Sequence, residues 1–238
     1  MAPKLLAHQT ITPNPTGTDW VCGDVHGHLA VLQTQLEQVG FQHGVDRLFL
    51  LGDLIDRGPA SETTLDWALS TDGVFSVLGN HELLFLARSQ SPAYREKHRQ
   101  IGGAWADSLS FGTYRRLAER CANECPLSMT VDCGHHQVGL VHAQSPVDDW
   151  AQIQEAAYSE QLAIDCTWPW DRAQRPEHSI ANISMVVSGH IGTSEIVSRG
   201  NQRWIDTLEA SGKLTLVPLK DLLDSTQSSK FGRRTEVP

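Results

Sequence analysis

The chain has 238 residues, of which 28 are acidic and 19 are Lys or Arg, so its formal net charge is −9. Apolar residues make up 40% of it, enough for a sizeable core and too many for a disordered chain. No run approaches the ~20 apolar residues of a membrane-spanning helix, and we expect no secretory signal in the polar N-terminus. The acidic balance argues against a nucleic-acid-binding face. An anionic substrate would therefore need a local source of positive charge.

The cysteines supply no framework for disulfides or zinc. The chain contains five of them, an odd number, and no C-x-x-C pair occurs. Cys121 and Cys125 are four residues apart and could share one face of a helix. We interpret the cysteines as idle thiols of a cytoplasmic protein, with a redox switch as the alternative.

Three strand–loop–helix units are predicted in the first half. The strands are Trp20–Cys22, Leu48–Leu51 and Val74–Leu78, and each is followed by a glycine and a polar residue. Apolar residues at helical spacing predict helices that begin near Leu29, near Ser61 and at Glu82. The strand ends recur at roughly the ~30 residues of one βαβ unit. Continuous apolarity at Leu48–Leu51 indicates a strand that is buried on both faces.

The second half changes to short β segments. Residues 91–124 have helical composition and an interruption at Gly102-Gly103, so we expect a helical insertion there. The strands predicted after it are Leu127–Val131, Gln137–Val141, Met185–Ser188, Glu195–Val197, Arg203–Asp206 and Leu214–Leu219. Because no linker separates the halves, we expect a single domain over residues 1–238, with its core at about 19–219 and a polar tail at 221–238.

Polar residues follow five of the predicted strands. They are Asp24, His26, Asp53, Asn80, His142 and His190. Taken singly, such an Asp is usually a cap and such a His a core residue, so the prediction depends on their recurrence at strand ends. Ligands bind beyond the carboxyl ends of strands in open α/β sheets, and carboxylate, amide and imidazole donors together suit Mn, Fe or Zn. Six ligands exceed what one catalytic ion needs, whereas two ions could share Asp53. The other histidines, among them His8, His28 and His98, lie in polar or loop contexts, and we assign them no metal.

Three segments resemble known signatures. Gly23-Asp24-Val25-His26-Gly27, residues 52–58 (GDLIDRG) and Gly79-Asn80-His81-Glu82 resemble the GDxHG, GDxxDRG and GNHE motifs of the phosphoprotein phosphatase family of binuclear metallophosphatases. The motifs have the family's order and spacing, and the resemblance covers roughly residues 19–207. It points to the bacterial and bacteriophage branch. It implies an α/β fold, the four-layer α/β/β/α sandwich of calcineurin-like metallophosphatases.

The resemblance also implies how two divalent ions are held. Asp24, His26 and Asp53 would bind one ion, and Asp53, Asn80, His142 and His190 would bind the other. We expect Mn²⁺, with Fe or Zn as alternatives. A hydroxide that bridges the two ions would attack phosphorus directly, without a phospho-enzyme.

Four further residues are assigned catalytic roles by the resemblance. Arg57 and Arg172 would bind phosphate oxygens through planar guanidinium forks. His81 would protonate the leaving oxygen, and Asp56 would orient His81 and favour its charged form. The chain departs from the family's pattern at Ile101, Ile191 and Leu208, none of which is a predicted ligand.

The expected protein is therefore a cytoplasmic, metal-dependent protein-serine/threonine phosphatase that hydrolyses phosphoserine and phosphothreonine monoesters, with phosphotyrosine as a further candidate substrate. Its expected partners are phosphoproteins or phosphopeptides, with no nucleic acid and no membrane. One alternative is a hydrolase of diadenosine tetraphosphate, but those relatives usually lack the acid that stands here as Asp56. Another is a metal-binding scaffold without catalysis. Such a protein would be expected to lack one of the six predicted ligands or the acid, whereas this chain retains all six and His81. The sequence leaves the natural substrate and the oligomeric state open.

Overall fold

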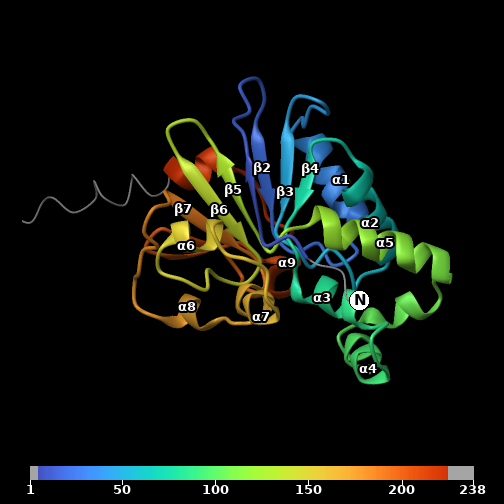
Figure 1. Ribbon diagram of the computed structural model, residues 1–238. Coiled ribbons are helices and arrows are strands. Elements are labelled where there is room, and N and C mark those ends of the chain that lie inside the picture. The colour runs from blue at the N-terminus through green and yellow to red at the C-terminus, as the bar shows by residue number, and fades with distance from the viewer. Residues whose placement is uncertain (1–4, 225–238) are drawn as a thin grey trace, which may run out of the picture.

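Two β-sheets pack face to face, and helices cover the outer face of each (Figure 1). The computed structural model describes residues 5–224. One sheet has the strand order β10-β2-β3-β4 and the other β1-β5-β6-β7-β9-β8. The arrangement confirms the α/β/β/α sandwich that the family resemblance implied. None of the helices in the described part of the chain is long and apolar enough to cross a membrane.

The four-stranded sheet contains the three predicted units. Its strands are β2 (Asp19–Cys22), β3 (Arg47–Leu50), β4 (Val74–Ser76) and β10 (Leu216–Pro218). The first three are parallel, whereas β10 is antiparallel to β2. The connecting helices are α1 (Leu29–Gln38) and α2 (Ser61–Ser70). The carboxyl ends of β2, β3 and β4 therefore lie at one edge of the sheet.

The six-stranded sheet is mixed. Its strands are β1 (His8–Ile11), β5 (Ser128–Asp132), β6 (Gln137–Val141), β7 (Met185–Ser188), β8 (Val197–Arg199) and β9 (Gln202–Trp204). In this sheet β7 lies between β6 and β9 and is parallel to both. Apolar side chains from both sheets fill the space between them, among them Phe49, Leu51, Val131, Leu140 and Val187.

The remaining helices connect or cover the sheets. They are α3 (Asn80–Ala87), α4 (Pro92–Gln100), the 3₁₀ helix η1 (Gly103–Asp107), α5 (Phe111–Glu124), α6 (Trp150–Gln154), α7 (Glu160–Thr167), α8 (Asp171–Gln174) and α9 (Leu208–Ser211). In Figure 1, α1, α2 and α5 lie beside the four-stranded sheet, and α6, α7 and α8 lie on the side of the six-stranded sheet. The helical insertion predicted at residues 91–124 is confirmed.

Several details differ from the expectations. The polar N-terminal lead contains β1, which pairs with β5 and buries Ile11 in the core. The strand expected at Glu195–Val197 instead forms at Val197–Arg199, because β8 and β9 close a hairpin there. Leu222 and Leu223 are buried although the polar tail was expected from residue 221. The rest of that expected tail, residues 225–238, lies outside the described residues.

His8, on β1, is held in a neutral form. Its Nδ1 lies 2.8 Å from the hydroxyl of Ser128, and its Nε2 lies 3.1 Å from the hydroxyl of Thr130. That Thr130 oxygen already accepts hydrogen bonds from Trp150 and Gln154, so its own proton points to the imidazole. Burial lowers the pKa of His8 to about 4, because a charged ring would lose its hydration.

We therefore expect protonation of His8 to destabilise the fold. The pKa falls from 6.5 to about 4 on folding, so the stabilisation is present above pH 6.5 and is lost as the pH falls toward 4. Over this interval the urea midpoint of the wild-type protein should fall more steeply than that of His8→Gln. His43→Gln, which removes an exposed histidine, should behave like the wild type. Parallel curves for wild type and His8→Gln would contradict the prediction.

Candidate metal centre and active site

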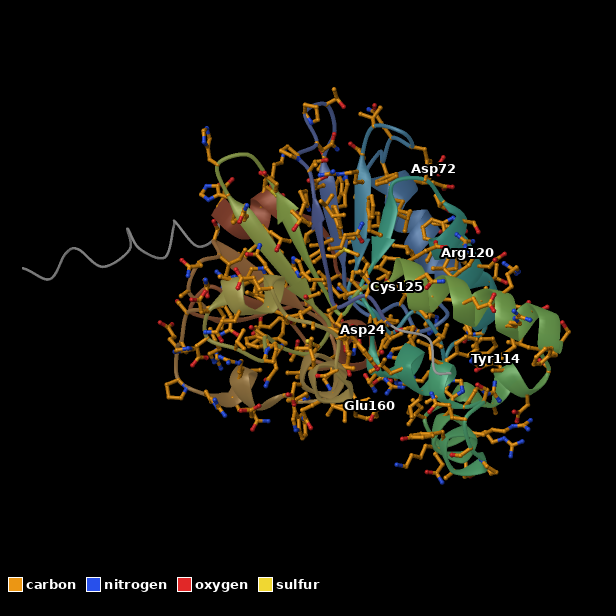
Figure 2. The ribbon with its side chains drawn as sticks, viewed as in Figure 1. Asp24, Asp72, Tyr114, Arg120, Cys125 and Glu160 are labelled. Atoms are coloured by element: carbon orange, nitrogen blue, oxygen red, sulfur yellow. The ribbon has the colours of Figure 1, made fainter. Side chains whose placement is uncertain are left out.

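The predicted ligands meet where the carboxyl ends of strands from both sheets converge. Figure 2 shows Asp24, which follows β2, near the centre of the molecule and below the strands. The backbone N–H of His190, beyond β7, donates to both carboxylate oxygens of Asp24 at 3.1 Å. The imidazole of His142, after β6, lies with its Nε2 2.9 Å from Oδ1 of Asn80, after β4. Residues far apart in sequence are thus brought together as predicted.

The backbone at this edge is unusual. Among the described residues, six that are not glycine have positive φ, and five of them are predicted site residues: His26, Asp53, Asp56, Arg57 and His190. Such conformations cost free energy in a residue with a Cβ and persist only where surrounding contacts enforce them. Their concentration here indicates that the fold is strained in order to aim these side chains.

Asp53 is the shared member of two groups of potential ligands. The first contains His26, Asp53 and His81, and the second contains Asp53, His142 and His190. Within each group the ligand atoms lie within 4.8 Å of one another. The expectation that Asp53 lies between two sites therefore agrees with the geometry. His81, assigned as an acid rather than a ligand, also lies in the first group.

Three imidazoles are each oriented by a backbone carbonyl. Nδ1–H of His26 donates to the carbonyl of Ile55 at 2.9 Å, and Nδ1–H of His142 donates to that of Leu51 at 2.7 Å. Nε2–H of His190 donates to the carbonyl of Trp168 at 3.1 Å. In each ring this bond fixes the orientation of the other nitrogen. Metal-binding histidines are commonly fixed by such a bond.

The donor set fits divalent ions. Nε2 of His142 faces two oxygen acceptors, Oδ1 of Asn80 at 2.9 Å and Oδ2 of Asp53 at 3.3 Å, so a cation is required among them. Burial opposes charge at both members of the His142–Asp53 pair. Even so, the Asp53 carboxylate raises the pKa of His142 to about 10, and His142 holds the pKa of Asp53 well below its usual range. The site thus favours positive charge, which a proton or a metal ion can supply.

Two other groups have the protonation behaviour that a metal site needs. Burial lowers the pKa of His26 and of His190 to about 4, so both rings are neutral and able to bind metal at neutral pH. Burial, followed by the repulsion of nearby Asp206, raises the pKa of the Asp24 carboxyl. A bound divalent cation would relieve that repulsion.

Glu82 is a site residue whose role the sequence did not reveal, although it belongs to the quoted GNHE segment. Its carboxylate accepts hydrogen bonds from the backbone N–H groups of Asp53 at 2.8 Å, Leu54 at 2.9 Å and Gly79 at 3.0 Å. Glycine is required at position 79 because a Cβ there would lie 2.1 Å from a carboxylate oxygen of Asp53. Glu82 therefore fixes the backbone that carries the shared ligand.

His81 and Asp56 form a buried pair. Nδ1 of His81 lies 2.7 Å from Oδ2 of Asp56, whereas Nε2 of His81 is buried without a hydrogen-bond partner among the described residues. Burial alone would lower the pKa of His81, but the charge of Asp53 and the hydrogen bond to Asp56 raise it. The ring thus holds a proton beside the predicted ligands.

The two predicted phosphate-binding arginines lie in different surroundings. Arg57 is half-exposed, with Nη1 2.7 Å from a Glu209 carboxylate oxygen and 3.0 Å from Nε2 of His26. Arg172, on α8, is buried and donates to Asp148 at 2.7 Å. Across residues 5–224 it makes no hydrogen bond or ion pair with a predicted metal ligand. Arg57 is therefore at the site, and the role of Arg172 stays a prediction.

Glu82→Gln should weaken metal binding. The amide replaces one acceptor oxygen with an NH₂ group that faces backbone N–H donors, so the turn carrying Asp53 loses its support. We expect affinity for Mn²⁺, measured by isothermal titration calorimetry, to fall by ~10–100-fold, as is usual for residues that orient ligands. Glu62→Gln changes an exposed acid on α2 in the same way and should leave the affinity unchanged. Equal affinities for all three proteins would refute this role.

Known proteins share this sequence pattern. Residues 20–194 match the family model described as calcineurin-like phosphoesterase. Serine/threonine-protein phosphatase 2 of Escherichia coli (strain K12) and of Salmonella typhimurium are 29% and 30% identical to the chain, over 84% of it and 92% of each relative. The symmetrical bis(5'-nucleosyl)-tetraphosphatase of Pseudomonas fluorescens is 49% identical, over 29% of this chain and 24% of that protein.

Solved structures share the fold. A serine/threonine phosphatase from Saccharomyces cerevisiae superposes with a TM-score of 0.58 at 14% identity, over 86% of this chain and 71% of that one. A protein provisionally identified as a diadenosine tetraphosphatase gives 0.55 at 22% identity, over 89% and 97%. These likenesses show the fold alone. With the family model matching most of the chain, the protein belongs to the calcineurin-like phosphoesterases, a family of metal-dependent phosphate ester hydrolases.

Proposed function

We propose that the protein is a protein-serine/threonine phosphatase that hydrolyses phosphoserine and phosphothreonine monoesters in phosphoproteins. The observation that carries the proposal is the extent of the similarity. The serine/threonine phosphatases match 84% of this chain and 92% of their own length, whereas the P. fluorescens tetraphosphatase matches 29% of the chain. The buried Asp56–His81 pair supports the same substrate class, because a monoester with an alkoxide leaving group needs an acid.

In this proposal the chain holds two ions, with Mn²⁺ as the expected metal and Fe or Zn as alternatives. Asp24, His26 and Asp53 hold one, and Asp53, Asn80, His142 and His190 hold the other. When bound, such ions neutralise charge on phosphoryl oxygens and make a water molecule acidic near neutral pH. Asp53 would contribute to both sites, since its carboxylate belongs to both groups of potential ligands.

His81 acts on the leaving group. Its Nε2 has no other hydrogen-bond partner in the described chain, so a proton held there is available to the departing ester oxygen. As the P–O bond breaks, that oxygen takes the bond electrons and the Nε2 proton, and the product alcohol leaves. Asp56 accepts from Nδ1–H at 2.7 Å, which keeps the ring oriented and favours its charged form.

The arginines bind the substrate's phosphate. Arg57 lies at the rim, where its guanidinium contacts His26 and the exposed carboxylate of Glu209. A phosphate group would replace that carboxylate as a doubly charged partner. Arg172 would have to leave Asp148 to reach the same phosphate.

A diadenosine tetraphosphate hydrolase remains the second candidate. One observation favours it: the locally higher identity of 49% to a tetraphosphatase, over 29% of this chain. Asp56 argues against it, because relatives of that type usually lack the acid. For the compartment we propose the cytoplasm, since all five cysteines are free thiols and reduced thiols suit that environment.

A panel of metals and substrates decides between the candidates. The protein is loaded with Mn, Fe, Zn or Mg and assayed on phosphoserine, phosphothreonine and phosphotyrosine peptides, nitrophenyl phosphate and diadenosine tetraphosphate. The highest kcat/KM on phosphoserine or phosphothreonine peptides supports the proposal. A higher value on diadenosine tetraphosphate overturns it, and so do two bound ions with no turnover of any ester, which is the behaviour of a scaffold.

His81→Asn should lower kcat on a phosphoserine peptide by ~10²–10⁴-fold if His81 is the acid. The loss should be much smaller on nitrophenyl phosphate, because its leaving oxygen departs without a proton. The measurement is steady-state kinetics with Mn²⁺, and His136→Asn, which changes an exposed histidine, is the control. An unchanged kcat on the phosphoserine peptide would remove His81 from this role.

A further inference from the structure

The carboxylate of Asp56 is surrounded by donors from the helical insertion. The side chain is fully buried. Besides His81, it meets Nε2 of His98, 3.1 Å from each carboxylate oxygen, and Nε1–H of Trp105, which donates to Oδ1 at 2.6 Å. His98 lies on α4 and Trp105 on η1, more than forty residues along the chain. Neither contact follows from the metal-binding motifs.

The insertion is fixed against the helix that begins with the metal and acid residues. Phe85, on α3, stacks on Trp105 with ring centroids 5.7 Å apart and meets the His98 ring edge-on at 5.9 Å. Gly103 lies so close to His98 that a Cβ would be 2.3 Å from the imidazole. The position of both donors is therefore set by tight packing rather than by a flexible loop.

Ion pairs hold the end of η1 against its neighbours. Asp107, the last residue of η1, binds the guanidinium groups of Arg88, Arg95 and Arg99. Arg88 directly follows α3, and the other two lie on α4, so one carboxylate connects all three elements. Arg88 is buried, and its guanidinium lies over the ring of Tyr114, which itself packs on Phe85.

Trp105 and His81 bind different oxygens of Asp56. The Trp105 N–H donates to Oδ1, and Nδ1 of His81 lies 2.7 Å from Oδ2. Without Trp105 and His98, the carboxylate could rotate about its own bond and would retain only His81 as a side-chain partner. An underbonded buried carboxylate is costly, so the His81 ring would no longer be held in a single orientation.

We propose that Trp105 and His98 are positioning residues which act through Asp56 to aim Nε2 of His81 at the leaving oxygen. This inference rests on the proposed phosphomonoesterase function and deepens it. The helical insertion is then part of the catalytic apparatus and not only a cover over α3.

The test is Trp105→Phe, which retains an aromatic ring against Phe85 and removes the N–H donor together with part of the indole ring. On a phosphoserine peptide with Mn²⁺, kcat should fall by roughly tenfold or more, short of the ~10²–10⁴-fold loss expected for removing the acid itself. KM should stay within about twofold, and kcat on nitrophenyl phosphate should change little. Equal losses on both substrates, or no loss on either, overturn the proposal.

The matched control is Tyr114→Phe. The Tyr114 hydroxyl, on α5 and labelled in Figure 2, donates to the carbonyls of Phe85 and Leu86 at 3.1 and 3.3 Å and makes no contact with Asp56. It packs on the same Phe85 ring at 5.1 Å. The Tyr114→Phe variant should therefore keep the wild-type ratio of kcat on the phosphoserine peptide to kcat on nitrophenyl phosphate. A selective loss equal to that of Trp105→Phe would mean that packing alone is responsible, and would overturn the proposal.

A second readout needs no turnover. The Nδ1–H of His81 in its 2.7 Å bond to Asp56 should give a downfield proton resonance in the metal-free protein, identified by its loss in His81→Asn. It should move in Trp105→Phe and stay in place in Tyr114→Phe. Should Trp105→Phe unfold, His98→Met removes the other donor and is subjected to the same two measurements. An unmoved resonance overturns the positioning role, whereas a wild-type protein that hydrolyses no monoester overturns the proposed function.

Discussion

The site depends on one buried negative charge, the carboxylate of Asp53. Its Oδ2 lies 3.3 Å from His142, 3.8 Å from His81 and 3.9 Å from His26. A charge that is removed from water is tolerated only when nearby groups compensate it. The two sheets supply that compensation because β2, β3, β4 and β6 all end at this point. The sandwich thus brings imidazoles from three chain segments, those that follow β2, β4 and β6, around one carboxylate.

The groups that orient these side chains are mostly backbone. Carbonyls of Leu51, Ile55 and Trp168 fix the rings of three histidines, and Glu82 fixes the turn that carries Asp53 through three N–H groups. Backbone partners do not depend on the identity of the residue that carries them. The geometry of the centre can therefore tolerate departures such as Ile191 and Leu208, which change side chains but leave the strand ends in place.

The first half of the fold could be predicted because parallel strands leave a simple signature. Continuous apolar runs that end in glycine and a polar residue predicted β2, β3 and β4, and the same rule predicted that Asp24, Asp53 and Asn80 meet. The rest depends on contacts between distant residues. Pairing with β5 makes His8–Ile11 a strand although the segment is polar.

The contacts of His98 also depend on residues far away in the sequence, so they could not be predicted from it. In sequence it is one polar residue of a helix rich in charge, and we assigned it no metal. In the structure it is buried against Phe85 and Asp56. No local pattern distinguishes it from its exposed neighbours, because its burial is created by the return of the chain at Gly102-Gly103. Arg172 is a similar case, since only the fold shows that Asp148 is its partner.

Part of the chain's acidic excess lies in the candidate site. Among residues 5–224, five carboxylates are buried, namely Asp24, Asp53, Asp56, Glu82 and Asp206, and all of them belong to the site or to the contacts that fix it. Such a cluster repels anions as long as nothing neutralises it, and burial, followed by the repulsion of Asp206, raises the pKa of the Asp24 carboxyl. Divalent ions would reverse the sign of the local potential, and Arg57 and a charged His81 would add to it. Five of the 28 acidic residues are thus among those that allow the cleft to become positive, so net charge and substrate charge do not conflict.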